Sequence, residues 1–335
     1  MADLFIVRTP MQIISAIEAM HYFHSSNNTL VIIYNKKKNN FKQIQKIIDI
    51  FHLATLFKNI IEVKSAQSSK FFLTLKLIRK FKKHSYNKLF IGLYDSMGKL
   101  FLANLSYQQA YLIDDGTATI VAHRHIVRTM HSQTVGSKEL RALFFGLHTQ
   151  HRTPLHFFTL FHLTPYSDET IITHRFEYLK QCFTQQYRHS TTIYLLGQNL
   201  TDVAIVSAEK YLCYIQQILK HYPDRNIVYI PHRLETLHPE LYALQHSKFT
   251  VMHNTMPIEL YFLTNRIYPN HIISFFTSAL YTLNILFDEA TIESFSIASE
   301  DIEHHHDSVT QCQKFLEETS VIQSPLQCYN DYKML

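Results

Sequence analysis

Residues 4–23 read LFIVRTPMQIISAIEAMHYF, and the pattern in this stretch decides the fold. Leu4 to Val7 form a short, continuous apolar run, which predicts a buried strand. Pro10, a residue favoured in the first turn of helices, follows, and Met11 to Phe23 then carry apolar residues at helical spacing. The stretch therefore predicts a strand, a turn and a helix, the repeating unit of parallel α/β sheets.

The same alternation continues along the chain, which indicates parallel sheets covered by helices on both faces. Between residues 149 and 166, aromatic residues and histidines mix without a clean period, and we interpret this segment as a connector or a partly exposed amphipathic stretch. We predict an α/β protein with two Rossmann-like domains facing a central cleft, residues 1–165 and 166–335, with a C-terminal helix able to pack back on the first domain. The expected strands are 4–7, 30–34, 60–63, 88–93, 110–113, 192–196, 226–230, 249–252 and 272–275, and the expected helices are 11–23, 41–51, 203–219, 257–263 and 279–286.

Composition excludes several classes of protein. Apolar residues make up 46% of the chain and charged residues 18%, which is typical of globular domains. The chain has six glycines, where average usage would give about twenty, and it contains neither G-x-G-x-x-G nor a Walker motif. The four cysteines show no paired spacing, and no secretory leader or membrane-spanning run is apparent. We therefore expect a cytoplasmic protein with reduced thiols and without a glycine-rich phosphate loop.

Basic residues gather in the first hundred positions, although the net charge is only +5. One run is Lys36–Lys38, and the other comprises Arg79, Lys80, Lys82 and Lys83. These runs are either solvated surface or a surface for anionic lipid headgroups or an anionic acceptor, helped by nearby Phe71, Phe72 and Phe81. The second interpretation predicts peripheral contact with the inner face of the cytoplasmic membrane. No nucleic-acid motif accompanies the charge, so we expect no nucleic-acid partner.

Three consecutive histidines, His304 to His306, invite a metal interpretation. Consecutive residues on a helix or strand do not converge on one ion, and acidic residues flank the run. We therefore predict an exposed polar tract and no metal site.

Polar clusters follow four of the predicted strands, and ligands of open parallel sheets bind beyond the carboxyl ends of strands. An acidic pair beside a turn can supply a general base, and a histidine with an arginine can protonate and neutralise a leaving phosphate. A glutamate can accept hydrogen bonds from a ribose, and two hydroxyls at a helix start can bind phosphate or simply cap the helix. An Asp-Gly turn or ordinary helix-start chemistry would explain each cluster equally well when taken alone. The clusters are Asp114-Asp115-Gly116, His232-Arg233, Pro257 with Glu259, and Thr277-Ser278.

This ordered set resembles the bacterial sialyltransferases, in particular the lipooligosaccharide type of glycosyltransferase family 52, and more distantly the bacterial polysialyltransferases. The resemblance covers nearly the whole chain. It begins at Leu4 to Gln12, where Arg8 and Thr9 lie in a stretch similar to that family's first strand and turn.

The resemblance implies a role for each cluster. Asp115 would deprotonate the acceptor hydroxyl, and His232 would supply the acid of the family's His-Pro motif, although Arg233 stands where proline is expected. A literal His238-Pro239 lies away from any strand end, so we favour His232. Pro257 and Glu259 would contact the nucleotide, and Thr277 and Ser278 would bind its phosphate.

A second segment offers an alternative base. Gly197-Gln198-Asn199-Leu200-Thr201-Asp202 also follows a strand and also resembles a family 52 segment. Gly197 and Gln198 would bind the donor, and Asp202 stands beside Asp115 as a candidate base.

The resemblance further implies a GT-B architecture and an inverting, metal-independent reaction that uses CMP-sialic acid as donor and no cofactor. The acceptor would be a terminal sugar, with galactose expected, on a lipooligosaccharide, O-antigen or capsule, and it could be lipid-linked. Another CMP-nonulosonic acid, another nucleotide sugar, or a non-catalytic nucleotide-binding assembly protein are the alternatives. The sequence leaves the linkage position, single transfer or polymerisation, and the oligomeric state open.

Overall fold

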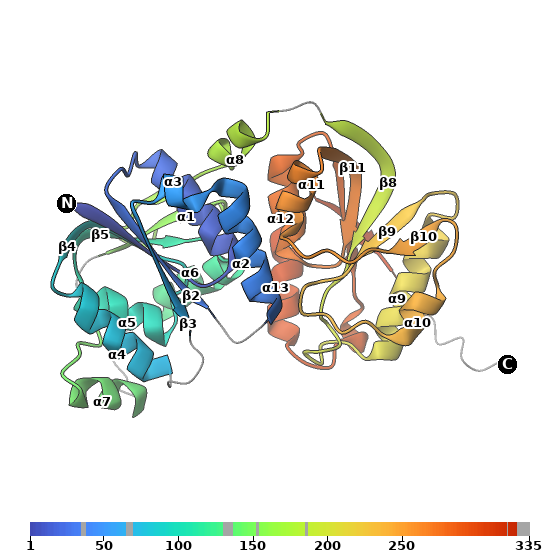
Figure 1. Cartoon of the computed structure of the whole chain (residues 1–335). Coiled ribbons are helices and arrows are strands. Elements are labelled where there is room, and N and C mark those ends of the chain that lie inside the picture. Colours follow the sequence, from blue (N-terminus) through green and yellow to red (C-terminus); the bar gives the residue numbers. More distant parts are fainter. Residues whose placement is uncertain are drawn as a thin grey trace. The chain divides into compact units, whose positions relative to one another are not determined.

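The structure of the chain is a computed structural model that describes residues 1–34, 38–64, 70–129, 137–151, 154–184, 187–319 and 321–326. Lys36, Lys37 and Cys328 lie outside these residues. The chain divides into two compact units, Met1–Cys182 and Phe183–Leu335. Figure 1 shows the first unit in blue to green and the second in yellow-green to red. No helix among the described residues is long and apolar enough to cross a membrane.

A seven-stranded sheet organises the first unit, with the strand order β3-β2-β1-β4-β5-β6-β7 and every neighbouring pair parallel. Helices connect its successive strands from β1 to β6, whereas residues 160–170 join β6 to β7 without a helix. The strands are β1 (Ala2–Val7), β2 (Asn28–Tyr34), β3 (Asn59–Lys64), β4 (Ser85–Ile91), β5 (Ser106–Ile113), β6 (Leu155–Thr159) and β7 (Ile171–Thr173). The helices are α1 (Pro10–Tyr22), α2 (Lys38–Phe51), α3 (Leu53–Leu56), α4 (Lys70–Phe81), α5 (Ser96–Asn104), α6 (Ala118–Thr129), α7 (Ser137–Phe144) and α8 (Glu177–Cys182).

A six-stranded sheet organises the second unit, with the order β10-β9-β8-β11-β12-β13 and every neighbouring pair again parallel. Its strands are β8 (Arg188–Leu196), β9 (Ile227–Ile230), β10 (Phe249–Val251), β11 (Ile267–Ser274), β12 (Thr291–Ser296) and β13 (Ile322–Pro325). Its helices are α9 (Ala208–His221), α10 (Pro239–Ala243), α11 (Ile258–Thr264), α12 (Ser278–Leu286), the short 3-10 helix η1 (Ser299–Asp301) and α13 (His306–Glu317).

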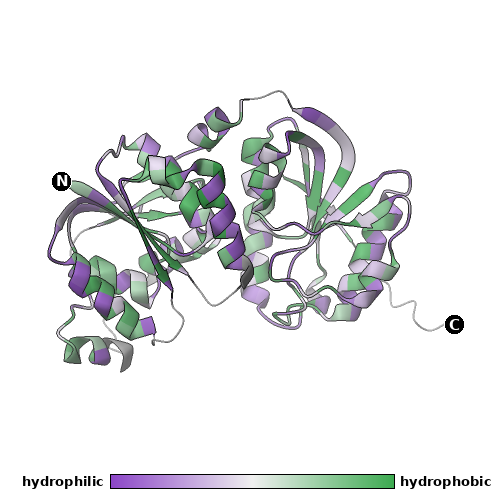
Figure 2. Cartoon of the chain, in the orientation of Figure 1, coloured by the Kyte–Doolittle hydropathy of each residue, from purple (hydrophilic) through white to green (hydrophobic). Residues whose placement is uncertain are grey.

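The central strands of both sheets are buried along their apolar runs. Leu4, Phe5 and Val7 of β1 are fully buried, and so are Ile193 and Leu195 of β8. Figure 2 shows the hydrophobic colour in the middle of both sheets, although the start of β8 is purple and pale. Burial on both faces explains why the strands read as continuous apolar runs and not as alternating ones. The predicted pair of Rossmann-like halves is confirmed.

The segment predicted as a connector, residues 149–166, is in part a strand, which corrects that expectation. β6 lies between β5 and β7 in the first sheet, and its Leu155, Phe157 and Phe158 are buried. The aromatic residues there fill the core, while His156 offers a ring nitrogen to the backbone N–H of Thr170. Since β7 also belongs to the first sheet, the first unit extends beyond residue 165 to Cys182.

Candidate functional site

Each sheet has one point where the strand order reverses. In the first sheet β2 lies on one side of β1 and β4 on the other, and in the second sheet β9 and β11 flank β8 in the same way. Such switch points open a crevice beyond the carboxyl ends of the strands, where α/β proteins bind ligands. The candidate residues are therefore described at the ends of these strands, one unit at a time.

Gly197 and Gln198 follow β8, at the switch point of the second sheet. The Gln198 amide oxygen accepts a hydrogen bond from the backbone N–H of Phe276, 2.9 Å away, which connects the end of β8 to the residues after β11. The Ser274 hydroxyl donates to the Leu196 carbonyl over 2.7 Å and adds a second connection. A methyl group on Gly197 would lie 2.3 Å from both the Glu235 carboxylate and the Tyr229 hydroxyl, so only glycine allows this close packing.

His232 follows β9, the neighbour of β8, and its half-buried ring is oriented by the local backbone. The ring Nδ1 accepts a hydrogen bond from the Leu234 backbone N–H at 3.3 Å. A neutral ring held in this way carries its proton on Nε2, the tautomer that can donate to an anionic oxygen. The geometry is therefore suited to a histidine that donates a hydrogen bond through Nε2, whereas transfer of a proton would first require a second proton on Nδ1 in place of the bond from Leu234.

Glu235 holds this loop in place, and the sequence analysis missed it. Its carboxylate accepts hydrogen bonds from the His232 backbone N–H, at 2.8 Å, and from the Tyr229 hydroxyl, which in turn contacts the Tyr211 hydroxyl at 2.9 Å. Burial raises the pKa of Glu235 to about 7, although these hydrogen bonds oppose the shift. Burial likewise raises the pKa values of Tyr211 and Tyr229 well above their ordinary range. The one signal in the sequence was Gly197, a glycine directly after a strand in a chain that has few.

Asp202, the alternative base, lies exposed in the loop between β8 and α9. Its carboxylate accepts a hydrogen bond of 2.9 Å from the Thr236 backbone N–H, so it connects this loop to the loop that carries His232. Its negative charge also contributes to raising the pKa of Glu235.

Glu259 and Pro257 stand at the start of α11. Pro257 is the N-cap of the helix, and the Glu259 carboxylate is 5% exposed and accepts a hydrogen bond of 2.6 Å from the Thr282 hydroxyl of α12. Burial raises the pKa of Glu259, while the positive charge of Arg233 acts in the opposite direction. Glu259 thus connects α11 to α12, and its carboxylate interacts electrostatically with Arg233.

Thr277 and Ser278 begin α12, directly beyond β11. The Thr277 hydroxyl caps the helix by accepting a hydrogen bond of 3.3 Å from the Ala279 backbone N–H. A hydroxyl that accepts such a bond can still donate its own hydrogen to an anion. Both side chains are half-buried, so the helix start combines a cap with two hydroxyl groups.

In the first unit, Thr9 and Asp115 come together although they follow different strands. The Thr9 hydroxyl donates to the Asp115 carboxylate over 2.6 Å, and the Asp115 backbone N–H donates to the Thr119 hydroxyl over 3.2 Å. Gly116, next to Asp115, has a φ of +64°, a conformation that favours glycine. The turn thus presents a half-buried carboxylate at the carboxyl end of β5.

Asp114, the other member of the acidic pair, faces the interior. It is fully buried and accepts hydrogen bonds of 2.6 Å from both the Thr159 hydroxyl and the Leu160 backbone N–H. The His174 Nε2 lies 3.5 Å from the same carboxylate. The two neighbouring carboxylates therefore have different partners, and Asp114 connects β5 to the end of β6.

Arg8, which follows β1, forms an ion pair with Asp95 over 3.0 Å. Asp95 also pairs with Lys70 and caps α5 by accepting from the Met97 and Gly98 backbone N–H groups. Burial alone would raise the pKa of Asp95, but the two cations and the helix start outweigh burial and leave this pKa below its ordinary value. Arg8 thus lies at the switch point of the first sheet, with its charge partly compensated.

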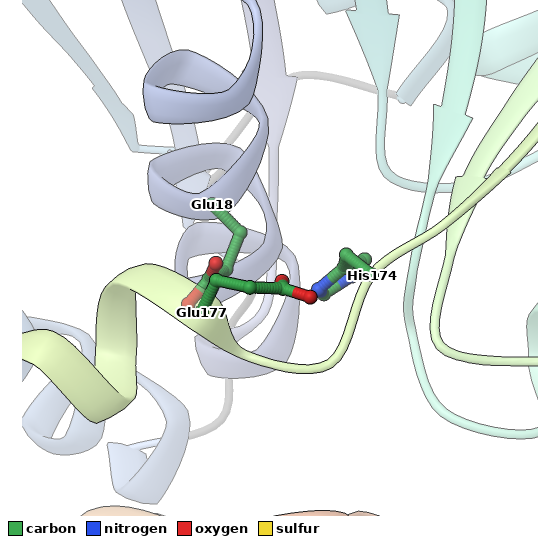
Figure 3. A group of neighbouring side chains, drawn as sticks. All are labelled: Glu18, His174 and Glu177. Carbon is green, nitrogen blue, oxygen red and sulfur yellow. The ribbon is translucent and has the colours of Figure 1, made fainter.

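One group among the described residues has the composition of a metal site. Figure 3 shows Glu18 of α1 directed toward His174, which follows β7, and Glu177, the first residue of α8, and one ligand atom from each lies within 4.8 Å of the others. However, the Glu18 oxygens accept the Tyr178 and Leu179 backbone N–H groups at 3.1 and 2.7 Å, and both Glu177 oxygens accept the Arg175 backbone N–H. These hydrogen bonds explain the group as the connection between α1 and α8. His304, His305 and His306 are exposed where α13 begins.

Known proteins resemble this chain in fold. No protein-family model and no curated protein matches it. The UDP-GlcNAc 2-epimerase of Methanocaldococcus jannaschii, solved with UDP-GlcNAc and UDP, is 13% identical with a TM-score of 0.51, and the match covers 97% of this chain and 89% of that one. A putative UDP-N-acetylglucosamine 2-epimerase from Listeria monocytogenes is 9% identical with a TM-score of 0.52, covering 95% and 88%.

The GT-B domain of a sialyltransferase from Photobacterium damselae is 11% identical with a TM-score of 0.48, covering 97% of this chain and all of that one. The two epimerase structures, whose TM-scores are higher, share the fold of this chain. Together with the two parallel sheets, they show an α/β chain of the GT-B type, made of two Rossmann-like halves.

Proposed function

We propose that the chain is an inverting, metal-independent sialyltransferase, which transfers sialic acid from a CMP donor to a terminal sugar of a bacterial surface glycan. The arrangement at the switch point of the second sheet carries this proposal. There Gly197 and Gln198 follow one central strand, and Thr277 and Ser278 follow its neighbour. His232 follows the strand on the other side, and its ring is held in the tautomer that donates from Nε2.

This arrangement suits a leaving group that carries one phosphate. The His232 Nε2–H would donate a hydrogen bond to the departing phosphate, while Arg233, the two hydroxyls and the start of α12 would stabilise its negative charge. CMP then leaves as the phosphate anion, and the His232 ring keeps its proton. Charge neutralisation of this kind needs no metal ion. As the acceptor oxygen bonds to the anomeric carbon from one face, the bond to the phosphate oxygen breaks on the other, which inverts the configuration.

The base would be Asp115, with Asp202 as the alternative. Asp115 is a half-buried carboxylate at a strand end, held by the Thr9 hydroxyl, and it would take the proton of the acceptor hydroxyl. Asp202 is exposed and connects two loops of the second unit. A galactoside is the first acceptor to test. If the acceptor is lipid-linked, the peripheral membrane contact expected from the basic runs would bring the enzyme to its substrate.

The test is release of CMP from CMP-sialic acid with a panel of galactosides, in the presence of excess EDTA. We expect turnover in the wild type and a loss of about 100-fold or more in kcat for His232→Ala, the usual cost of removing one hydrogen-bond donor to a developing negative charge. His238→Ala is the matched control, because His238 belongs to the literal His-Pro pair and only begins α10. Equal activity in both variants would remove His232 from the mechanism, and strict metal dependence would overturn the scheme.

The same assay distinguishes the two candidate bases. In Asp115→Asn and Asp202→Asn, the new amide oxygen can still accept from Thr9 or from the Thr236 backbone N–H, so the local structure should persist. The variant that lacks the true base should lose most of its kcat and keep its affinity for CMP. If neither variant loses turnover, both residues are excluded.

A second candidate follows from the structures of similar fold. The two with TM-scores above 0.5 are UDP-GlcNAc 2-epimerases, one of them bound to UDP-GlcNAc and UDP. The chain could therefore act on a UDP-sugar. Incubation with UDP-GlcNAc, followed by measurement of UDP release and of epimerised sugar, tests this candidate. Activity with UDP-GlcNAc and none with CMP-sialic acid would favour it.

A further inference from the structure

The exposed face of α4 carries charge of one sign only. Seven side chains of this helix are buried, and the exposed ones include Phe72 and, one or two turns further on, Lys76, Arg79 and Lys80. Lys82 and Lys83 follow directly and are also exposed. No acidic residue occurs between residues 70 and 83. The outer face of α4 is therefore a cationic stripe that begins at an exposed phenyl ring.

The neighbouring helix α7 presents apolar side chains to solvent. Phe144 is 86% exposed, the largest fraction among the large apolar side chains of the described residues. Leu140 and Leu143 are 60% and 50% exposed, and Phe72 of α4 is 53% exposed. Large apolar groups exposed together in this way are typical of interaction surfaces.

Ring contacts join these residues into one patch. Phe145 packs between the helices through edge-on and tilted ring contacts, with ring centroids 5.5 Å from Phe144, 5.8 Å from Phe72 and 5.3 Å from Phe71. The Arg141 guanidinium of α7 lies 4.2 Å from the Phe71 ring of α4. Figure 1 shows α7 beside α4 in the first unit. We call the exposed apolar residues and the cationic stripe together the α4–α7 surface.

Of the three phenylalanines that the sequence analysis associated with the basic run, two are not part of this surface. Phe71 and Phe81 are 7% and 4% exposed and belong to the core, because they fall on the inner face of α4. Phe72 and the α7 residues supply the apolar contribution instead.

A cavity of about 330 Å³ lies between α4, α5 and α7, next to this patch. Its polar lining includes Lys70, Lys99, Arg141, Ser96, Thr74 and Thr149. Lys70 is paired with Asp95, and Lys99 lies over the Tyr94 ring. The lining nevertheless contains three cationic side chains and three hydroxyls, a composition that suits a phosphate group.

We propose that the α4–α7 surface binds an anionic lipid bilayer, with Phe72, Leu140, Leu143 and Phe144 inserted among the lipids and the basic residues on the headgroup phosphates. A bilayer satisfies both halves of the surface, because its phosphates meet the cations and its acyl boundary takes up the apolar groups. A second copy of this chain would bring cations against cations across a symmetric interface. A polyanion without an apolar phase would leave Phe144 in water.

The test is flotation of the full chain with vesicles of phosphatidylglycerol and phosphatidylethanolamine in equal parts, compared with vesicles of phosphatidylcholine alone. We expect binding to the anionic vesicles only, weakened by salt. The double variant Phe144→Ser, Leu143→Ser should lower the partition coefficient by about tenfold or more, because two apolar side chains can no longer be buried in the bilayer. Lys80→Glu with Lys83→Glu should lower it by more than about 25-fold, at about fivefold for each neutralised cation.

Matched controls change the second unit. Lys220→Glu with Lys314→Glu alters the net charge equally at exposed positions of α9 and α13, and Val203→Ser removes an exposed apolar side chain. Equal losses in controls and test variants would overturn the proposal, as would equal binding to both kinds of vesicle. Light scattering that shows a dimer lost in the Phe144→Ser variant would assign the surface to a second copy instead. Because vesicle binding needs no turnover, this result is independent of the proposed glycosyl transfer.

Discussion

At the scale of single residues, Glu235 combines several structural roles. Its carboxylate lies beneath Gly197, accepts from the His232 backbone and from Tyr229, and is influenced by the charge of Asp202. It therefore determines how the loops after β8 and β9 lie against each other. A change in its protonation should alter the hydrogen bond that holds the His232 backbone. The sequence could not predict this role of Glu235, because a glutamate three residues after a histidine matches no known motif. The role depends on Gly197, Tyr229 and Tyr211, which come close to Glu235 only in the folded chain.

Glu235 should make stability depend on pH in a defined direction. Burial raises its folded pKa from 4.5 to about 7, so the folded chain keeps a proton that the unfolded chain loses earlier. The resulting stabilisation is fully present below pH 4.5 and is lost as the pH rises through about 7, by about 3 kcal/mol at most. Glu235→Gln carries no titrating proton, so its free energy of unfolding should fall less between pH 5 and pH 8. Urea unfolding followed by circular dichroism at both pH values measures the difference.

Glu240→Gln is the matched control for this measurement, because Glu240 is an exposed glutamate on the neighbouring helix α10. It should leave the pH dependence of the wild type unchanged. If Glu235→Gln and the wild type lose the same free energy over this range, Glu235 does not titrate as its burial implies.

At the scale of elements, strands with continuous apolar runs were predictable, and strands that depend on partners were not. Leu4 to Val7 and Leu30 to Tyr34 predict buried strands without any knowledge of their neighbours. β12 has the sequence TIESFS, and its buried Glu293 is tolerated because Tyr222, His271 and Ser324 all bond to it. No local pattern shows such partners, so β12 was missed. Helix starts were misplaced for a similar reason, since α9 begins after Ser207, whose hydroxyl caps it, and not at Val203.

The start of α12 offers a test that separates capping from phosphate binding. Thr277→Ala removes the hydrogen bond to the Ala279 backbone N–H and should destabilise the chain by about 1 kcal/mol. Thr277→Asp retains the cap, since a carboxylate accepts the same bond, and should keep the stability within about 0.5 kcal/mol. If Thr277 faces the donor phosphate, the added negative charge should nevertheless weaken CMP binding by about tenfold or more. Thermal unfolding and calorimetric titration with CMP give the two readouts, and undiminished CMP affinity in Thr277→Asp would limit Thr277 to its capping role.

At the scale of the whole molecule, the alternation of runs predicted two parallel α/β halves, and both sheets confirm it. The sequence could not place the unit boundary, because β7 is a three-residue strand recognised only by its pairing with β6. The sequence also could not distinguish the roles of Asp114 and Asp115, because both are aspartates at neighbouring positions. In the structure, one is fully buried against Thr159 and the other is half-buried against Thr9.

The proposal assigns the nucleotide to the second unit, and hydrogen exchange can test that assignment on the whole chain. With CMP at about 100 times its Kd, the free energy of local opening should rise by about 2.7 kcal/mol where the ligand must be bound for the loops to stay closed. We expect the strongest protection in peptides that contain residues 197–202, 232–236 and 277–280, with AMP at the same concentration as the control nucleotide. These segments follow three neighbouring strands of one sheet, so a ligand at its switch point would contact all three. Protection of only one segment would not support a nucleotide site there. Should the strongest protection fall on residues 8–12 and 114–119 instead, the donor belongs to the first unit, and the role of His232 on the phosphate and that of Asp115 as base must be abandoned together.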